Sequence, residues 1–153
     1  MESEILKKIY QYCAYQDRST AEVRKKLTEW DVSREEQENI IAHLEAERFL
    51  DEERFTRSFV RGKFFHKSWG RTKIRHELRL RTIPAAVIER VMNQEIPPET
   101  YQQTIETLIT RKRSEYRSDS PEKQKEKIFR FLLQKGFESA YILPVLHADA
   151  DDD

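Results

Sequence analysis

Apolar residues recur along most of the chain at spacings of three and four, which is the period of one face of an α-helix. Ser19 with Glu22, and Ser33 with Glu36, have the spacing of helix-capping boxes. Three prolines fit the first turn of a helix: Pro84, Pro98 and Pro121. No Asn-Gly or Asp-Gly pair offers a hairpin turn. We therefore predict only helices, at residues 4–16, 20–30, 34–48, 52–66, 70–81, 84–94, 98–117, 121–135 and 138–147.

The apolar pattern occurs three times. Each copy has apolar residues at positions i, i+4 and i+9: Val23, Leu27 and Val32; Ile74, Leu78 and Ile83; Ile128, Leu132 and Phe137. The following helix of each copy carries a second apolar stripe: Ile40, Ile41 and Leu44; Val87, Ile88 and Val91; Tyr141, Ile142 and Val145. A three-helix copy is too small to bury these faces alone, so we predict an all-α fold of three tandem, stacked three-helix repeats.

The repeats set the expected domain boundaries. We assign the first repeat to residues 1–50 and the third to residues 98–147. The second, basic repeat spans 51–97 and begins with a helix over 51–66. Hydrophobic and charged residues each make up 37% of the chain, which is lean for one globular core and favours an elongated array. Residues 148–153 are rich in Asp, and we expect a disordered acidic tail there.

One position differs between the repeats. The residue just before the last apolar position is Asp31, Thr82 or Gly136. Gly readily adopts the left-handed conformation that commonly closes a helix, Asp does so less readily, and β-branched Thr does so poorly. We therefore expect the second repeat to turn differently at Thr82.

The charges are segregated although their sum is zero, with 28 Lys and Arg against 28 Asp and Glu. Between Glu29 and Glu53, ten acidic residues stand against two arginines. Between Arg54 and Arg81, ten basic residues stand against Glu77 alone. This basic stretch also contains Phe and Trp residues, and it is the candidate functional segment.

The basic stretch has two interpretations. Its arginines could pair with the acidic segment 29–53 while its aromatic rings pack, although exposed ion pairs contribute only about 0–1 kcal/mol each. Alternatively, it binds a polyanion: guanidinium groups contact phosphates, and Phe64, Phe65 or Trp69 stacks on unpaired bases at roughly 1–3 kcal/mol each. An acidic protein surface would attract the same charges. Charge alone does not separate these partners.

Helical spacing divides the stretch into an inward and an outward side. Phe55, Phe59 and Gly62 fall on one side of the 51–66 helix and should face the core. Another side carries a ridge of Arg54, Arg57 and Arg61 with Phe64 beside it. We predict that Trp69, at the corner between helices, stacks on a partner or anchors the corner. The predicted contact residues are Arg57, Arg61, Lys67, Arg71, Arg75 and Arg79.

Catalytic patterns are missing from the sequence. The four histidines have no metal-ligand spacing, no Gly-rich phosphate loop occurs, and Cys13 has no basic neighbour in sequence that would activate it. We therefore predict no enzyme activity, no cofactor and no metal site. The single cysteine and the lack of a long apolar run suit the cytosol. The lack of a heptad run favours a monomer.

The chain resembles the RecX family of regulators of the RecA recombinase. The resemblance rests on STAEVRKKL from Ser19, LDEERFTRSFVRGK from Leu50 and WGRTKIRHEL from Trp69. It implies a curved array of tandem three-helix repeats. It also implies a partner, the RecA filament on single-stranded DNA, whose recombinase and ATPase activities the protein would inhibit in DNA repair, recombination and the SOS response. The alternative is a helical repeat protein that binds nucleic acid nonspecifically without RecA.

Overall fold

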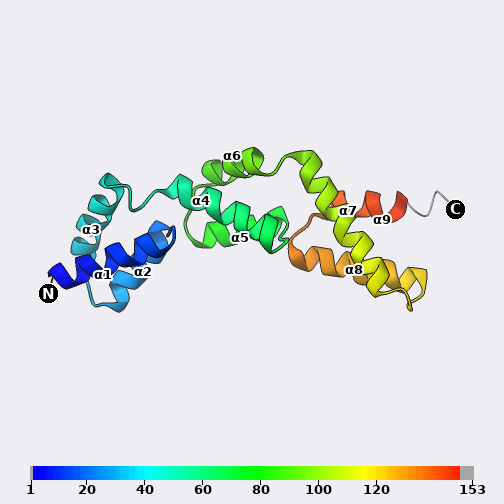
Figure 1. The fold of residues 1–153 in the computed structure, drawn as a ribbon, viewed down its shortest axis with the longest axis horizontal. Coiled ribbons are helices and arrows are strands. Elements are labelled where there is room, and N and C mark those ends of the chain that lie inside the picture. The colour runs from blue at the N-terminus through cyan, green and yellow to red at the C-terminus, as the bar shows by residue number, and fades with distance from the viewer. Residues whose placement is uncertain (1, 149–153) are drawn as a thin grey trace. The chain divides into compact units, whose positions relative to one another are not determined.

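A computed structural model describes residues 2–148, and all the regular structure in this range is helical (Figure 1). The elements in chain order are α1 (Glu2–Tyr15), α2 (Thr20–Glu29), α3 (Arg34–Ala46), α4 (Glu52–Arg61), the π-helical segment η1 (Gly62–His66), α5 (Arg71–Leu80), α6 (Ala85–Glu95), α7 (Pro98–Glu115), α8 (Pro121–Lys135) and α9 (Ser139–Ala148). The predicted all-α class is confirmed. Ala148 ends α9, and the rest of the predicted acidic tail lies outside the described residues.

The predicted helix starts are present as real caps. The hydroxyl oxygens of Ser19, Ser33 and Ser120 each accept a hydrogen bond from the backbone N–H three residues later. Asp51 accepts the N–H of Arg54 at 3.0 Å and so begins α4. Each cap satisfies an amide that the first helical turn leaves unpaired.

The repeated apolar positions form one recurring structural motif. After α2, the N–H of Val32 donates to the carbonyl of Leu27, and the N–H of Asp31 donates to that of Thr28, both at 3.0 Å. The same two bonds recur after α5 and after α8. This is the Schellman turn, which folds the next apolar residue back onto the last helical turn. The nine residues of the pattern are all buried: Val23, Leu27, Val32, Ile74, Leu78, Ile83, Ile128, Leu132 and Phe137.

The prediction that the second repeat turns differently is wrong. Thr82 has φ 59°, the same value as Asp31, and Gly136 has φ 99°, so all three lie in the left-handed region. The hydrogen bonds of the Schellman turn and the burial of Ile83 hold Thr82 in a conformation that a β-branched residue disfavours. Tertiary packing has overridden a local preference.

The chain divides into two compact units, and the dividing points fall inside the helices of the middle repeat. One unit contains everything described before Val60, together with Glu77–Val91. The other contains Val60–His76 and everything described from Met92 onward. In the first unit, α1, α2 and α3 share a core that includes Ile9, Leu27 and Leu44.

The helix predicted over 52–66 continues, but its last part is π-helical. Phe64, within η1, is only 2% exposed and contacts the ring of Tyr101 at a centroid distance of 5.9 Å. It continues the buried face of Thr56 and Val60, at steps of four residues. Placing Phe64 beside the arginine ridge was therefore wrong, and it has no free face for a base. Phe65 is 49% exposed instead. Phe55 faces the core as predicted, whereas Gly62 is only partly buried.

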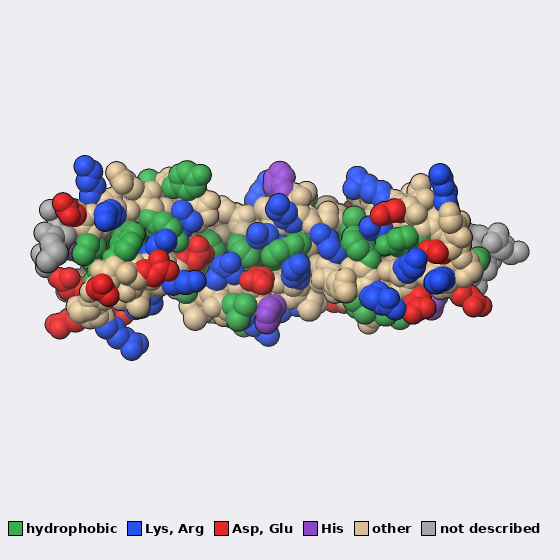
Figure 2. Space-filling view, turned by 90° about the horizontal axis from the view of Figure 1, so that it is seen from below, with side chains coloured by type: hydrophobic (Ala, Val, Ile, Leu, Met, Phe, Trp, Pro, Cys, Tyr) green, Lys and Arg blue, Asp and Glu red, His purple; other side chains and the backbone are tan. Residues whose placement is uncertain are grey.

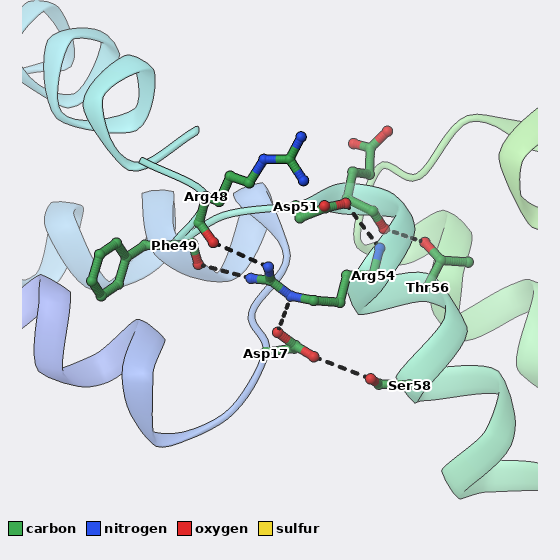
Figure 3. A network of polar contacts seen from close by, with 8 residues as sticks. Asp17, Arg48, Phe49, Asp51, Arg54, Thr56 and Ser58 are labelled. Atoms are coloured by element: carbon green, nitrogen blue, oxygen red, sulfur yellow. Dashed lines mark hydrogen bonds and ion pairs between the residues drawn. The ribbon is translucent and has the colours of Figure 1, made fainter. Parts of the chain in front are cut away.

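Arg54 is exposed, as the predicted ridge requires, but it also belongs to a polar network within the first unit (Figure 3). Its Nε donates to Asp17 Oδ1 at 2.7 Å, and its Nη1 donates to the carbonyl of Arg48 at 3.0 Å. The other carboxylate oxygen of Asp17 accepts the hydroxyl of Ser58 at 3.1 Å. Arg54 thus joins the α1–α2 loop, the end of α3 and the start of α4.

Replacing Thr82 by Gly tests the strain in the second Schellman turn. A left-handed residue other than Gly is disfavoured by roughly 1–2 kcal/mol, and part of this is offset by the greater freedom of Gly in the unfolded chain. We expect Thr82→Gly to raise the free energy of unfolding by about 0.5–1 kcal/mol in urea denaturation. Thr110→Gly, the same change inside α7, should lower it. A loss of stability for Thr82→Gly would contradict this interpretation.

Removing the Arg54 side chain should destabilise the first unit. The change removes hydrogen bonds to the Asp17 carboxylate and to two carbonyl groups, and because these hydrogen bonds are exposed we expect a loss of about 1.5 kcal/mol in urea denaturation. The matched control is Arg90→Ala, which removes an exposed ion pair with Glu53 in the same unit and should change stability by less than about 1 kcal/mol. Equal effects of the two changes would show that the network contributes no more than a surface pair.

Candidate polyanion-binding surface

The N-terminus of α5 is capped by the C-terminal end of α8. The N–H of Gly70 donates to the carbonyl of Lys135 at 2.8 Å, and the N–H of Thr72 donates to that of Gly136 at 3.0 Å. Between them, the N–H of Arg71 donates to the hydroxyl of Tyr101 at 3.1 Å. Amides that begin one helix and carbonyls that end another are both left unpaired within their own helices. The contact satisfies both and sets opposite ends of two helix dipoles against each other.

Gly70 and Gly136 permit this contact, which we call the α5–α8 junction. A Cβ atom on Gly70 would lie 2.3 Å from the carbonyl carbon and oxygen of Gly136. A Cβ atom on Gly136 would lie 2.4 Å from Cβ of Lys73. Neither residue can carry a side chain unless the two backbones move apart.

Lysines from four segments gather at the junction. We call Lys67, Lys73, Lys112 and Lys135 the lysine cluster; they follow η1 or lie on α5, α7 and α8. Nζ of Lys135 donates to the carbonyl of Lys67 at 2.7 Å. The pKa of Lys135 is lowered by burial first and then by the charges of Lys73, Lys112 and Lys67. Lys112 also forms an ion pair with Glu115 at 2.9 Å. Folding therefore collects like charges that repel one another.

Trp69 lies next to two ammonium groups. Nζ of Lys73 is 4.3 Å from the ring centroid, and Nζ of Lys63 is 4.8 Å from it. Cations are attracted to the face of an indole ring, and these distances are within the range of that attraction. Of the two roles predicted for Trp69, this arrangement favours the corner anchor, because a stacked base would have to displace a lysine.

Arg71 is partly exposed, and its guanidinium group lies against two aromatic rings. Its guanidinium carbon lies 4.0 Å from the ring centroid of Tyr101 and 5.6 Å from that of Tyr141. Tyr101 is fully buried and donates its hydroxyl to Glu138, and burial, followed by this hydrogen bond, raises its pKa. Arg71 is therefore part of the support for the junction.

The remaining predicted contact residues are more accessible. Arg61 pairs with Glu95 at 2.7 Å, yet its side chain is 61% exposed. Arg57 lies 3.9 Å from Glu53 on the same helix. Arg75 is partly exposed on α5, and Arg79 follows it four residues later and is exposed. Lys67 is exposed and belongs to the lysine cluster.

Internal pairing explains only part of the basic stretch. Within the acidic segment 29–53, Glu53 binds Arg57. Outside that segment, Arg54 binds Asp17, Arg61 binds Glu95, and Arg81 binds Glu22 and Glu77. On the face seen in Figure 2, basic and acidic side chains are interspersed. The segregation along the sequence is therefore partly lost on folding, whereas the lysine cluster brings together positive charges from separate segments.

Sequence reasoning missed Lys112 and Lys135. Both lie on helices of the third repeat, far from the basic stretch in sequence. The repeat alignment places Lys135 opposite Trp30 and Arg81, which says nothing about its neighbours in space. A signal was present in Gly136, because a glycine that departs from the other two copies can mark the close approach of another backbone.

The described residues show little that resembles a catalytic centre. Burial raises the pKa of Cys13 to about 11, and this outweighs the opposing charges of Arg18 and Arg54. The thiol is therefore unreactive at neutral pH. Between residues 2 and 148, no group of three or more His, Cys, Asp or Glu side chains is placed to hold a metal ion. No helix in that range has the length and apolar character needed to span a bilayer.

Comparison with known proteins identifies the family. The models of the first, second and third three-helix domains of RecX match residues 6–44, 51–92 and 99–146. The regulatory protein RecX of Mannheimia succiniciproducens is 31% identical over 121 residues, which cover 78% of this chain and 76% of that protein. The chain belongs to the RecX family. The predicted family and the three tandem three-helix domains are thus confirmed.

Other RecX proteins differ in length from this chain. The regulatory protein RecX of Oceanobacillus iheyensis is 32% identical over 135 residues, which cover 88% of this chain but 49% of that protein. The chain thus spans about half the length of that relative. A crystal structure of regulatory protein RecX matches with a TM-score of 0.83 at 24% identity, covering 99% of this chain and 73% of that one. RecX from Lactobacillus salivarius matches with a TM-score of 0.81 at 23% identity, covering 95% and 97%. These two structures share the RecX fold.

Gly70→Ala should disrupt the α5–α8 junction. The added methyl group would overlap the Gly136 carbonyl, so both backbone hydrogen bonds would lengthen, and we expect a loss of roughly 1–3 kcal/mol in urea denaturation. The environment of Trp69 should change, which its fluorescence would report. Gly62→Ala is the matched control: its Cβ would meet nothing within 4 Å, and stability should stay the same or rise slightly. A Gly70→Ala protein as stable as the parent would rule out the tight junction.

Proposed function

We propose that this chain binds RecA filaments formed on single-stranded DNA and inhibits their recombinase and ATPase activities. Membership of a family whose relatives are named regulatory proteins supports a regulatory role. Arrays of small helical repeats present extended surfaces, which suit an extended partner. We place this activity in the cytosol and expect the chain to act as a monomer without a cofactor.

The lysine cluster is the observation that carries the proposal. Like charges brought together oppose folding, and at Lys135 burial and then the charges of Lys73, Lys112 and Lys67 lower the pKa of the ammonium group. A polyanionic partner would remove this repulsion on binding and would gain charge-assisted hydrogen bonds from the ammonium groups. The cluster therefore favours binding of an anionic surface, either filament DNA or acidic side chains of RecA.

We propose two kinds of residue at this surface. In the second unit, Arg61 and Arg75 contact the partner together with the lysine cluster, which includes Lys67. In the first unit, Arg57 and Arg79 make contacts of their own. Trp69 keeps Lys63 and Lys73 in place, and Arg71 supports the start of α5. These two residues affect binding indirectly, by positioning those groups. The division follows from the ring contacts of Trp69 and Arg71 described above.

A second candidate function is nonspecific binding to single-stranded nucleic acid without RecA. It is favoured by Phe65, whose ring is 49% exposed and lies 5.8 Å from the guanidinium carbon of Arg61. An exposed ring beside a cation suits stacking of an unpaired base of any sequence. In that case, inhibition of RecA would arise from competition for DNA.

Titration of RecA ATPase on single-stranded DNA, beside binding to the same DNA without RecA, separates the two functions. We expect ATP hydrolysis to fall at chain concentrations well below those that bind bare DNA. If inhibition appears only where bare DNA is bound, competition explains it, and log K should then fall by about 0.7 per tenfold rise in salt for each phosphate neutralised. Unchanged hydrolysis at saturating chain would refute a RecA-directed function.

Amino-acid substitutions test whether inhibition of RecA depends on the proposed contact residues. The combined change Lys67→Ala, Lys73→Ala and Lys135→Ala should raise the half-inhibitory concentration about tenfold, equivalent to about 1.4 kcal/mol. Arg75→Ala with Arg79→Ala should weaken inhibition while leaving the helical circular-dichroism signal unchanged. The control combines Lys7→Ala, Lys25→Ala and Lys123→Ala, three exposed lysines outside the cluster. Equal losses for the cluster and control variants would leave only a general charge effect and would contradict the assigned surface.

A further inference from the structure

Lys135 differs in its surroundings from an ordinary surface lysine. It is the last residue of α8, its side chain is partly buried, and its Nζ is fixed on the carbonyl of Lys67. The charged groups acting on it come from three other segments: Lys67 after η1, Lys73 on α5 and Lys112 on α7. Within residues 4–148, no carboxylate forms an ion pair with it.

Partial burial and the neighbouring lysines both favour the neutral amine form of Lys135. Burial weakens hydration of the ammonium group, and three neighbouring cations repel its charge, so its pKa is lowered. A lysine that is desolvated or lies beside another cation is the form used as a nucleophile in proteins. The hydrogen bond to the carbonyl of Lys67 uses one N–H and leaves the nitrogen lone pair of the neutral amine available.

We propose that Lys135 is an acylation site and that acyl phosphates are its donors. The anionic phosphate group of the donor is attracted by the lysine cluster, which brings the carbonyl carbon close to Nζ. Nζ forms a bond to that carbon while the bond from the carbon to the phosphate oxygen breaks. Inorganic phosphate leaves with the electron pair, and Nζ loses one proton to solvent. The products are an amide and phosphate, so no oxidant, reductant or metal is needed.

Acylation would act as a switch on the cluster. It removes one positive charge from the junction and places a neutral amide where an ammonium group stood. This consequence rests on the proposed function, because a weaker cluster matters only if the cluster binds an anionic partner. The chemistry at Nζ does not depend on that function.

The test is a time course of the full chain with acetyl phosphate at pH 8, with each lysine followed by peptide mass spectrometry. We expect Lys135 to be acetylated several-fold faster than Lys123, an exposed lysine at the start of the same helix. Lys73→Ala with Lys112→Ala should slow the reaction at Lys135 and leave Lys123 unchanged. Lys73→Ala keeps the Cβ atom that packs on Gly136, so the junction should persist, and circular dichroism checks the fold. Acetylation of Lys135 no faster than that of Lys123 would overturn the proposal.

A second arm tests the switch separately. Lys135→Gln copies the acylated state, and Lys135→Arg keeps the charge without the nucleophile. We expect Lys135→Gln to weaken inhibition of RecA ATPase several-fold and Lys135→Arg to retain it. If the parent chain inhibits RecA and Lys135→Gln inhibits equally well, the switch is refuted while the proposed function stands. If the parent chain does not inhibit RecA, the proposed function fails, and the mass spectrometry alone decides whether Lys135 is the reactive lysine.

Discussion

The backbone contact at the α5–α8 junction is the constraint on which the candidate site depends. The amides of Gly70 and Thr72 are satisfied by the last carbonyls of α8, at distances of 2.8 and 3.0 Å. Buried backbone groups without partners destabilise a fold, so two helix ends that satisfy each other are held together strongly. The contact needs main chains without side chains between them, and only Gly70 and Gly136 provide this.

Electrostatics at the junction oppose the contact that creates it. Bringing α8 against the start of α5 also brings Lys135 to Lys67 and Lys73, and burial followed by repulsion from the neighbouring lysines lowers the pKa of Lys135. The aromatic side chains nearby compensate. Tyr101 packs against Phe137 at a centroid distance of 5.4 Å and supports Arg71, while Trp69 attracts Lys73 of the cluster and also Lys63. A hydrophobic and hydrogen-bonded frame thus holds charges that would otherwise separate.

Sequence patterns predicted the frame but not the cluster, for a physical reason. Helical periodicity and capping residues are local, so the nine core positions and the caps at Ser19 and Ser33 could be predicted from the sequence. Phe64 packs on Tyr101, which is distant in sequence, so the sequence did not show that its ring is covered. The partner of Arg54 is Asp17, 37 residues away, and Lys135 meets Lys67 across 68 residues. No local signal encodes such pairs.

The Schellman turns at the matching repeat positions after α2, α5 and α8 explain why only one of them contains glycine. All three turns need a left-handed residue, and Asp31 and Thr82 show that side chains are accommodated there when the position is exposed. Gly136 is buried, and a Cβ atom there would lie 2.4 Å from Cβ of Lys73. The turn alone therefore does not require glycine in this protein. Glycine appears in the repeat where a second backbone approaches, so it marks the α5–α8 junction, and with it the lysine cluster, rather than the end of a helix.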